Sequence, residues 1–131
     1  PIHTSASGKV LLSSFSQRKV EEIITERGLE RLTEKTITDP KRLFEELSRI
    51  RHQGYAIDDE ECEMGHRCIS VPIYDYSGNV AGAISAFDSF ERMTESRMQQ
   101  VLLPELQRTA IEISLRLGYS VNDSLHQSPT I

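Results

Sequence analysis

The stretch that decides the fold is CISVPIYDYSGNVAGAISAF, residues 68–87. In its first part, large aliphatic residues at 69, 71 and 73 alternate with smaller ones at 68, 70 and 72, the two-residue period of a strand with one buried face. Asp75 to Asn79 are turn formers, and Val80 to Phe87 follows as a second strand rich in small residues. The stretch predicts an antiparallel hairpin. A register in which paired residue numbers have an odd sum places Cys68 and Ser85 on one face, opposite the aliphatic side chains.

Three segments before the hairpin carry helix signals. The first is expected from about Ser5 to Phe15, with small residues at its start. The second begins after Ser16, a good N-cap residue, and ends at Gly28. The third follows Asp39-Pro40, a cap and a favoured first helical residue, and ends at Gly54. Its apolar residues recur at helical spacing, so we expect an amphipathic helix.

The remaining segments complete an α+β pattern. Tyr55 to Ile57 predicts a short strand that enters the acidic stretch Asp58-Asp59-Glu60-Glu61. A last helix is expected from Thr94 to Gly118, kinked at Pro104 because proline lacks an N–H. This order predicts one α+β domain over residues 1–119 and a frayed polar tail over residues 120–131. Three strands make a thin sheet, which indicates that further strands precede this stretch in the parent chain.

Composition narrows the class of protein. The chain has 131 residues, enough for one hydrophobic core. Its net charge of -5 argues against a nucleic-acid surface on this piece. The sequence contains no run of about 18 apolar residues, so it predicts no membrane span. Two cysteines are too few for a secreted disulfide scaffold, so we expect reduced thiols and a cytoplasmic location.

Two clusters invite a catalytic or metal-binding interpretation. The acidic stretch has the donors for a divalent metal or for acid–base chemistry, and its alternative is a solvated loop with one or two acids held by local hydrogen bonds. Cys62, His66 and Cys68 offer three zinc ligands, but only His3 stands as a distant fourth, and the spacing matches no common zinc motif. The same Cys and His lack an oxyanion-hole signature for nucleophilic catalysis. We therefore assign no metal and no catalytic residue.

The start of the first helix, Ser5-Ala6-Ser7-Gly8-Lys9, superficially suggests a phosphate-binding loop. It lacks the leading glycine, and Lys9 is followed by Val10 instead of Ser or Thr, so that interpretation fails. Small residues at a helix start leave the first backbone N–H groups accessible, which suits an anion such as a carboxylate. The alternative is an ordinary helix start packed against a close neighbour.

Several stretches together resemble the C-terminal domain of IclR-type transcriptional regulators. They are HTSASGKVLL (3–12), LT (32–33), TITD (36–39), RHQGYAIDDEE (51–61), GHRCISVPI (65–73), AIS (83–85) and LGY (117–119). Each is weak alone, whereas their order and spacing over residues 3–119 make the combined match specific. The resemblance implies a GAF-like antiparallel sheet flanked by helices, lacking its first strands here.

The resemblance also implies a function. It predicts a sensor of a small organic acid or sugar acid, without enzyme activity or cofactor, that assembles as a dimer or tetramer. DNA binding, as repressor or activator, would belong to a separate N-terminal winged helix-turn-helix domain. The implied effector contacts are Ala6, Ser7, Asp58, His66, Cys68, Ser85 and Phe87. In two departures from the family pattern, Ser7 adds a hydroxyl and Phe87 is larger than the small polar residue common there.

Two other classes of function stay open from sequence. One is a metal- or acid–base-dependent enzyme that uses Asp58, Glu60, His66 and Cys68. The other is a purely structural dimerisation module whose pocket is empty.

Overall fold

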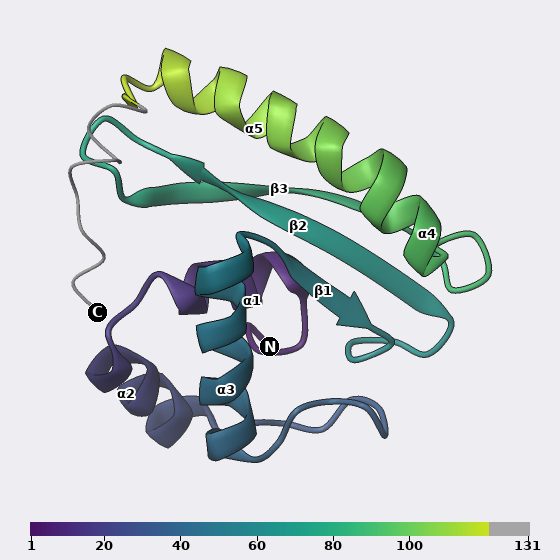
Figure 1. Cartoon of the computed structure of the whole chain (residues 1–131). Coiled ribbons are helices and arrows are strands. Elements are labelled where there is room, and N and C mark those ends of the chain that lie inside the picture. The colour runs from purple at the N-terminus through teal and green to yellow at the C-terminus, as the bar shows by residue number, and fades with distance from the viewer. Residues whose placement is uncertain (121–131) are drawn as a thin grey trace.

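The computed structural model of the chain describes residues 1–120, and the expected tail beyond Ser120 lies outside them. A three-stranded sheet has α1, α2 and α3 on one side and α5 along the other (Figure 1). The elements are α1 (Ala6–Ser13), α2 (Gln17–Arg27), α3 (Pro40–Gln53), β1 (Ala56–Asp59), β2 (His66–Tyr74), β3 (Val80–Ser89), α4 (Glu95–Arg97), a π-helical turn η1 (Met98–Leu102) and α5 (Leu103–Arg116). The α+β prediction is confirmed. None of the described helices is long and apolar enough to cross a membrane.

Local capping chemistry fixes the ends of the first helices where the sequence predicted them. The Ser16 side chain accepts a hydrogen bond from the Lys19 N–H at the start of α2. Asp39 does the same for Lys41 at the start of α3. Gly54 ends α3 with a φ of 82°, a left-handed conformation that glycine adopts without strain. These caps position α3 against α1 and the sheet.

The sheet has the order β1-β2-β3, with both pairs antiparallel. Cys68 lies opposite Phe87 and Ser70 lies opposite Ser85, so the odd-sum register is confirmed. The strands are longer than predicted, because β1 includes Asp58 and Asp59, β2 begins at His66 and β3 extends to Ser89. The acidic stretch is therefore half strand and half loop.

Alternation along the strands divides the core in two. Ile69 and Val71 pack with buried residues of the C-terminal helix, namely Met98, Leu103, Leu106 and Ala110. On the other face, Cys68 and Ala83 pack against the cluster built by α1 and α3. The sheet thus separates an apolar layer under α5 from a layer of apolar and polar side chains under α1; Figure 1 shows the two helices on opposite sides of the sheet.

The last helix differs from its prediction around Pro104. The structure places a single π-helical turn, Met98–Leu102, directly before the proline-containing α5. Pro104 has no N–H to donate to the preceding turn, and the Leu103 N–H bonds the Met98 carbonyl oxygen across a widened turn. Where the sequence predicts a kink at Pro104, the structure has a π turn that ends two residues before the proline.

Candidate functional site

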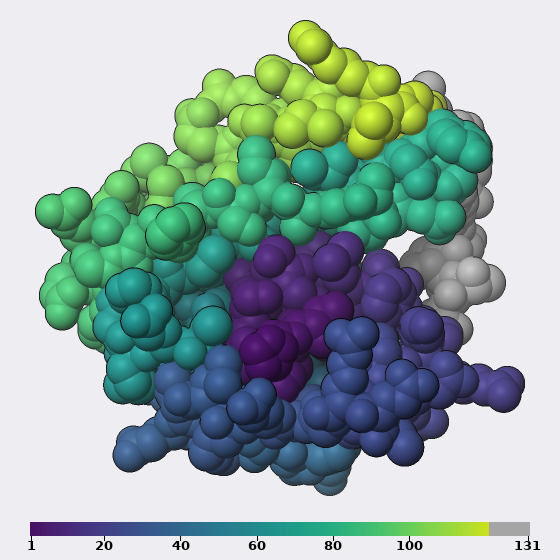
Figure 2. Space-filling view, turned by 180° about the vertical axis from the view of Figure 1, so that it is seen from behind, coloured from purple at the N-terminus to yellow at the C-terminus, as the bar shows by residue number. Residues whose placement is uncertain are grey.

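The first residues of α1 are buried against the sheet face that this helix covers. Ala6 is fully buried and Ser7 is half-buried. A Cβ atom added at Gly8 would lie 1.9 Å from the Ile2 carbonyl oxygen, so only glycine permits this close approach. Seen from behind, the first residues fill the space between the strands and the α2–α3 side (Figure 2).

Two backbone donors are left at this helix start. The Ser5 hydroxyl accepts the Gly8 N–H at 3.0 Å, and the Ser5 carbonyl accepts the Lys9 N–H at 3.0 Å. The N–H groups of Ala6 and Ser7 find no acceptor among residues 1–120. Unpaired donors at a helix N-terminus, together with the helix dipole, favour a bound anion.

Five of the predicted contact residues share one face of the sheet, His66 among them at the start of β2. Asp58, Cys68 and Phe87 lie opposite one another across the three strands. Ser85 lies opposite Ser70 in the neighbouring cross-strand pair, and their hydroxyl groups are hydrogen-bonded to each other. Because Cys68 packs against the α1 cluster, this is the face that α1 covers.

The sheet face that α1 covers is buried at β1 and exposed at β3. Asp58 is 7% exposed, and Cys68 is partly buried. Ser85 is exposed, and Phe87 is 76% exposed on the last strand. The buried residues of this face therefore lie toward β1, and the exposed ones lie on β3.

Asp58 is held rigidly and keeps one oxygen free. Its Oδ1 accepts the N–H of Glu61 at 2.8 Å and of Cys62 at 3.3 Å, whereas Oδ2 accepts no hydrogen bond from the described residues. Burial raises the pKa of the Asp58 carboxyl, outweighing the two backbone donors that lower it. Burial likewise raises the pKa of the Cys68 thiol, so this sulfur is not an activated thiolate.

The acidic stretch lies at the end of β1 and in the loop after it and is mostly buried, which corrects the alternative of a solvated loop. Asp58, Glu60 and Glu61 are each less than 9% exposed. Both Glu60 oxygens are engaged, by the Lys35 ammonium at 2.8 Å and by the Gly65 N–H at 2.8 Å. The Lys35 hydrogen bond holds the pKa of Glu60 below its usual value. Local hydrogen bonds do fix these acids, as that alternative expected.

The main group that the sequence interpretation missed is Lys9. Its side chain is completely buried, and its Nζ donates to Glu61 at 2.9 Å, to Glu46 at 3.0 Å and to the Ile57 carbonyl at 2.6 Å. One ammonium group thus ties α1 to α3, to β1 and to the acidic loop. The available signal was helical spacing, because Lys9 lies three residues after the buried Ala6 and so on the buried side of α1.

His66 and the two cysteines do not form a metal site. His66 shares the face of Cys68 but is exposed at the start of β2, with Nδ1 3.4 Å from Glu63. Cys62 is exposed, and the Nε2 of His3 hydrogen-bonds a backbone carbonyl oxygen at 2.8 Å. Within residues 1–120, no three His, Cys, Asp or Glu side chains are arranged to hold a metal ion.

Sequence comparison identifies related regulators. A family model described as the C-terminal region of the bacterial transcriptional regulator IclR matches residues 1–115. The HTH-type transcriptional regulator KdgR of Escherichia coli K12 is 38% identical over 119 residues, which cover 91% of this chain and 45% of KdgR. The HTH-type transcriptional regulator BhcR of Paracoccus denitrificans is 41% identical over 97 residues, which cover 74% of this chain and 35% of BhcR. The chain spans less than half the length of these relatives.

Solved structures of proteins from the same family have a similar fold. The C-terminal domain of E. coli KdgR superposes with a TM-score of 0.84 at 38% identity, covering 91% of this chain and 72% of that one. A double mutant of the Acinetobacter PobR inducer-binding domain, solved with 3-hydroxybenzoic acid, gives a TM-score of 0.84 at 34% identity, covering 87% and 65%. The Thermotoga maritima IclR gives 0.83 at 36% identity, covering 90% and 47%. The chain belongs to the IclR family of bacterial transcriptional regulators and corresponds to the C-terminal effector-binding domain of that family.

Proposed function

We propose that this domain binds a small organic acid between the start of α1 and the sheet face that carries Asp58, Cys68 and Ser85. The observation that carries the proposal is the pair of unoccupied N–H groups of Ala6 and Ser7 on the helix that packs on this face. A helix start with free donors suits a carboxylate. Among the described residues, no group of the protein accepts a hydrogen bond from these two N–H groups.

Each predicted contact has a distinct role in this proposal. The ligand carboxylate accepts from the Ala6 and Ser7 N–H groups, and the Ser7 hydroxyl adds a donor. The free Oδ2 of Asp58 accepts from a ligand hydroxyl, and the Ser85 hydroxyl serves the exposed side. Cys68 and Phe87 supply apolar contact, and His66 lies at the edge. A hydroxy acid or sugar acid matches this pattern, and the PobR relative is solved with an acid that has both groups.

The proposed consequence of binding is regulatory. The relatives are about twice as long as this chain and are named transcriptional regulators or repressors, which favours signalling over catalysis. We propose that residues 1–119 sense the acid within a cytoplasmic regulator, a dimer or tetramer, whose separate DNA-binding domain contacts the operator. The ligand would then shift operator binding, as repressor or activator, only through unequal affinity for the two states.

A melting-temperature screen of the 131-residue chain against hydroxy, keto and sugar acids tests this proposal. An acid at about 100 times its Kd stabilises the domain by roughly 2.7 kcal/mol, a clearly measurable shift. The Asp58→Asn variant should lose most of that shift, since it replaces the free carboxylate oxygen. The matched control is Asp75→Asn in the hairpin turn, whose Oδ1 also accepts backbone N–H groups. Equal shifts in both variants, or none with any acid, contradict the proposal.

A further inference from the structure

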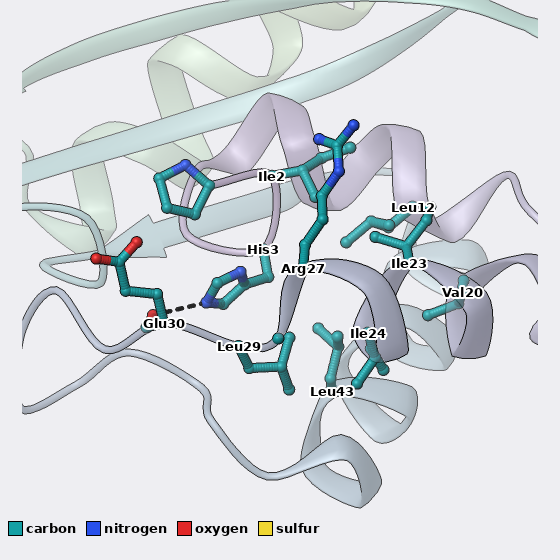
Figure 3. Close-up of a pocket in the computed structure, with 12 residues that line it drawn as sticks. Ile2, His3, Leu12, Val20, Ile23, Ile24, Arg27, Leu29, Glu30 and Leu43 are labelled. Atoms are coloured by element: carbon teal, nitrogen blue, oxygen red, sulfur yellow. Dashed lines mark hydrogen bonds between the residues drawn. The ribbon is translucent and has the colours of Figure 1, made fainter.

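A cavity lies between the start of the chain and α2, apart from the sheet face with Asp58, Cys68 and Ser85, here called the effector face. Its volume is about 180 Å³, somewhat larger than the roughly 150 Å³ apolar cavities that accept benzene. His3 and Arg27 are among the residues that line it (Figure 3). None of the seven predicted effector contacts lines it.

The floor of this cavity is apolar. Side chains of α1, α2, α3 and the α2–α3 loop meet there (Figure 3). They are Leu12, Val20, Ile23, Ile24, Leu29 and Leu43. Leu12, Val20 and Leu43 are at most 1% exposed. Such a floor holds water poorly and favours a hydrocarbon ring or branched chain.

The polar side chains that line the cavity are those of His3, Arg27 and Glu30. Arg27 is exposed and makes no ion pair or hydrogen bond with the described residues. His3 is 3% exposed and uses only Nε2, on the Glu30 carbonyl at 2.8 Å. The Glu30 carboxylate lies on the far side of His3 from Arg27 (Figure 3). Arg27 is the one arginine or lysine among the lining residues, so an anionic head group would pair with its exposed guanidinium group.

We infer that this cavity is a second small-molecule site, for an aromatic monocarboxylate of about the size of benzoate. The ring occupies the aliphatic floor, and the carboxylate pairs with Arg27. The inference is independent of the proposed effector site. Leu12 belongs to α1, so a ligand here contacts the same helix whose start carries Ala6 and Ser7.

Methyl-resolved NMR of the 131-residue chain tests the inference with benzoate, benzyl alcohol and benzylamine as probes. Benzoate should shift the methyl signals of Val20, Ile24 and Leu43, and should bind more tightly than the other two. Arg27→Gln should weaken benzoate at least tenfold and leave benzyl alcohol unchanged. Arg18→Gln, an exposed change elsewhere on α2, is the matched control.

The outcomes separate this site from the effector face. Ile24→Phe, which fills the floor, should abolish the Val20 and Leu43 shifts; if it does not fold, Arg27→Gln decides alone. The inference is overturned if benzoate shifts only signals near Cys68 and Ser85, if it shifts none, or if Arg27→Gln and Arg18→Gln behave alike. Failure of the organic-acid screen with the benzoate shifts intact would sink the proposed effector site and leave this inference standing.

Discussion

Toward α5, strands β2 and β3 present Ile69, Val71 and Ile84, whereas toward α1 they present Cys68 and, two residues further, the paired serines 70 and 85. The two faces come from alternate residues of the same hairpin. The α5 side is held by many apolar contacts spread over the sheet. The α1 side also has an apolar cluster, from α1 and α3, but adds one buried ammonium group, Lys9, and polar groups on the strands. One strand pair thus supplies an apolar wall on one side and, on the other, a partly polar surface on which we propose that the ligand binds.

The largest expected effect removes the ion-pair centre of the α1 side. Lys9→Met leaves Glu61 buried without its cation, and breaking a buried pair in this way costs about 3–5 kcal/mol. Urea denaturation should show this loss, and the exposed Lys19→Met should show almost none. A loss below about 1 kcal/mol would mean that the α1 side does not depend on Lys9.

The next effect tests the distributed packing of the α5 side. Ile69 is completely buried, and Ile69→Ala should cost about 3 kcal/mol through lost burial and a residual cavity. The acid-induced rise in melting temperature should persist, because Ile69 faces away from the proposed ligand. Thermal denaturation with and without ligand measures the loss of stability and the ligand-induced rise in melting temperature. If Ile69→Ala lost that rise but kept its stability, the two faces would not have separate roles.

A smaller effect is expected on the polar face. Ser85→Ala removes an exposed hydroxyl that pairs with Ser70, so stability should fall by about 1 kcal/mol or less. Ligand affinity should fall as well, by roughly tenfold for one lost hydrogen bond. Calorimetric titration beside urea denaturation separates these two results. Unchanged affinity would remove Ser85 from the site.

The smallest effect is a pH dependence. Burial raises the folded-state pKa of Asp58 above its unfolded value of about 3.9, so the folded chain binds this proton more tightly. The stability contribution of Asp58 is therefore greatest at low pH and falls as pH rises through the interval between the two values. Asp58→Asn cannot titrate, so wild type should lose stability relative to this variant between pH 4 and pH 7. Urea denaturation at both pH values checks the sign, and a relative gain by wild type would contradict it.

Local rules explain what the sequence predicted. The hairpin register followed from alternation, and the ends of α2 and α3 followed from Ser16, Asp39 and Gly54, whose capping depends on near neighbours only. The placement of Asp58, Cys68 and Ser85 on one face followed from the same alternation and the antiparallel pairing.

Long-range contacts explain what it could not predict. Lys9 meets Glu46 and Glu61 across large sequence separations, and no local pattern names such partners. The cavity beside Arg27 exists only because three helices leave space between them. The π turn before Pro104 depends on how the helix compensates for a missing donor.

NMR mapping of a stabilising acid on the 131-residue chain decides whether the α1 face of the sheet receives an organic acid. We expect amide shifts at Ala6, Ser7, Cys68 and Ser85, with the methyl signals of Ile69 and Ile84 unchanged. Shifts confined to the α5 face or to the cavity beside Arg27 would contradict it.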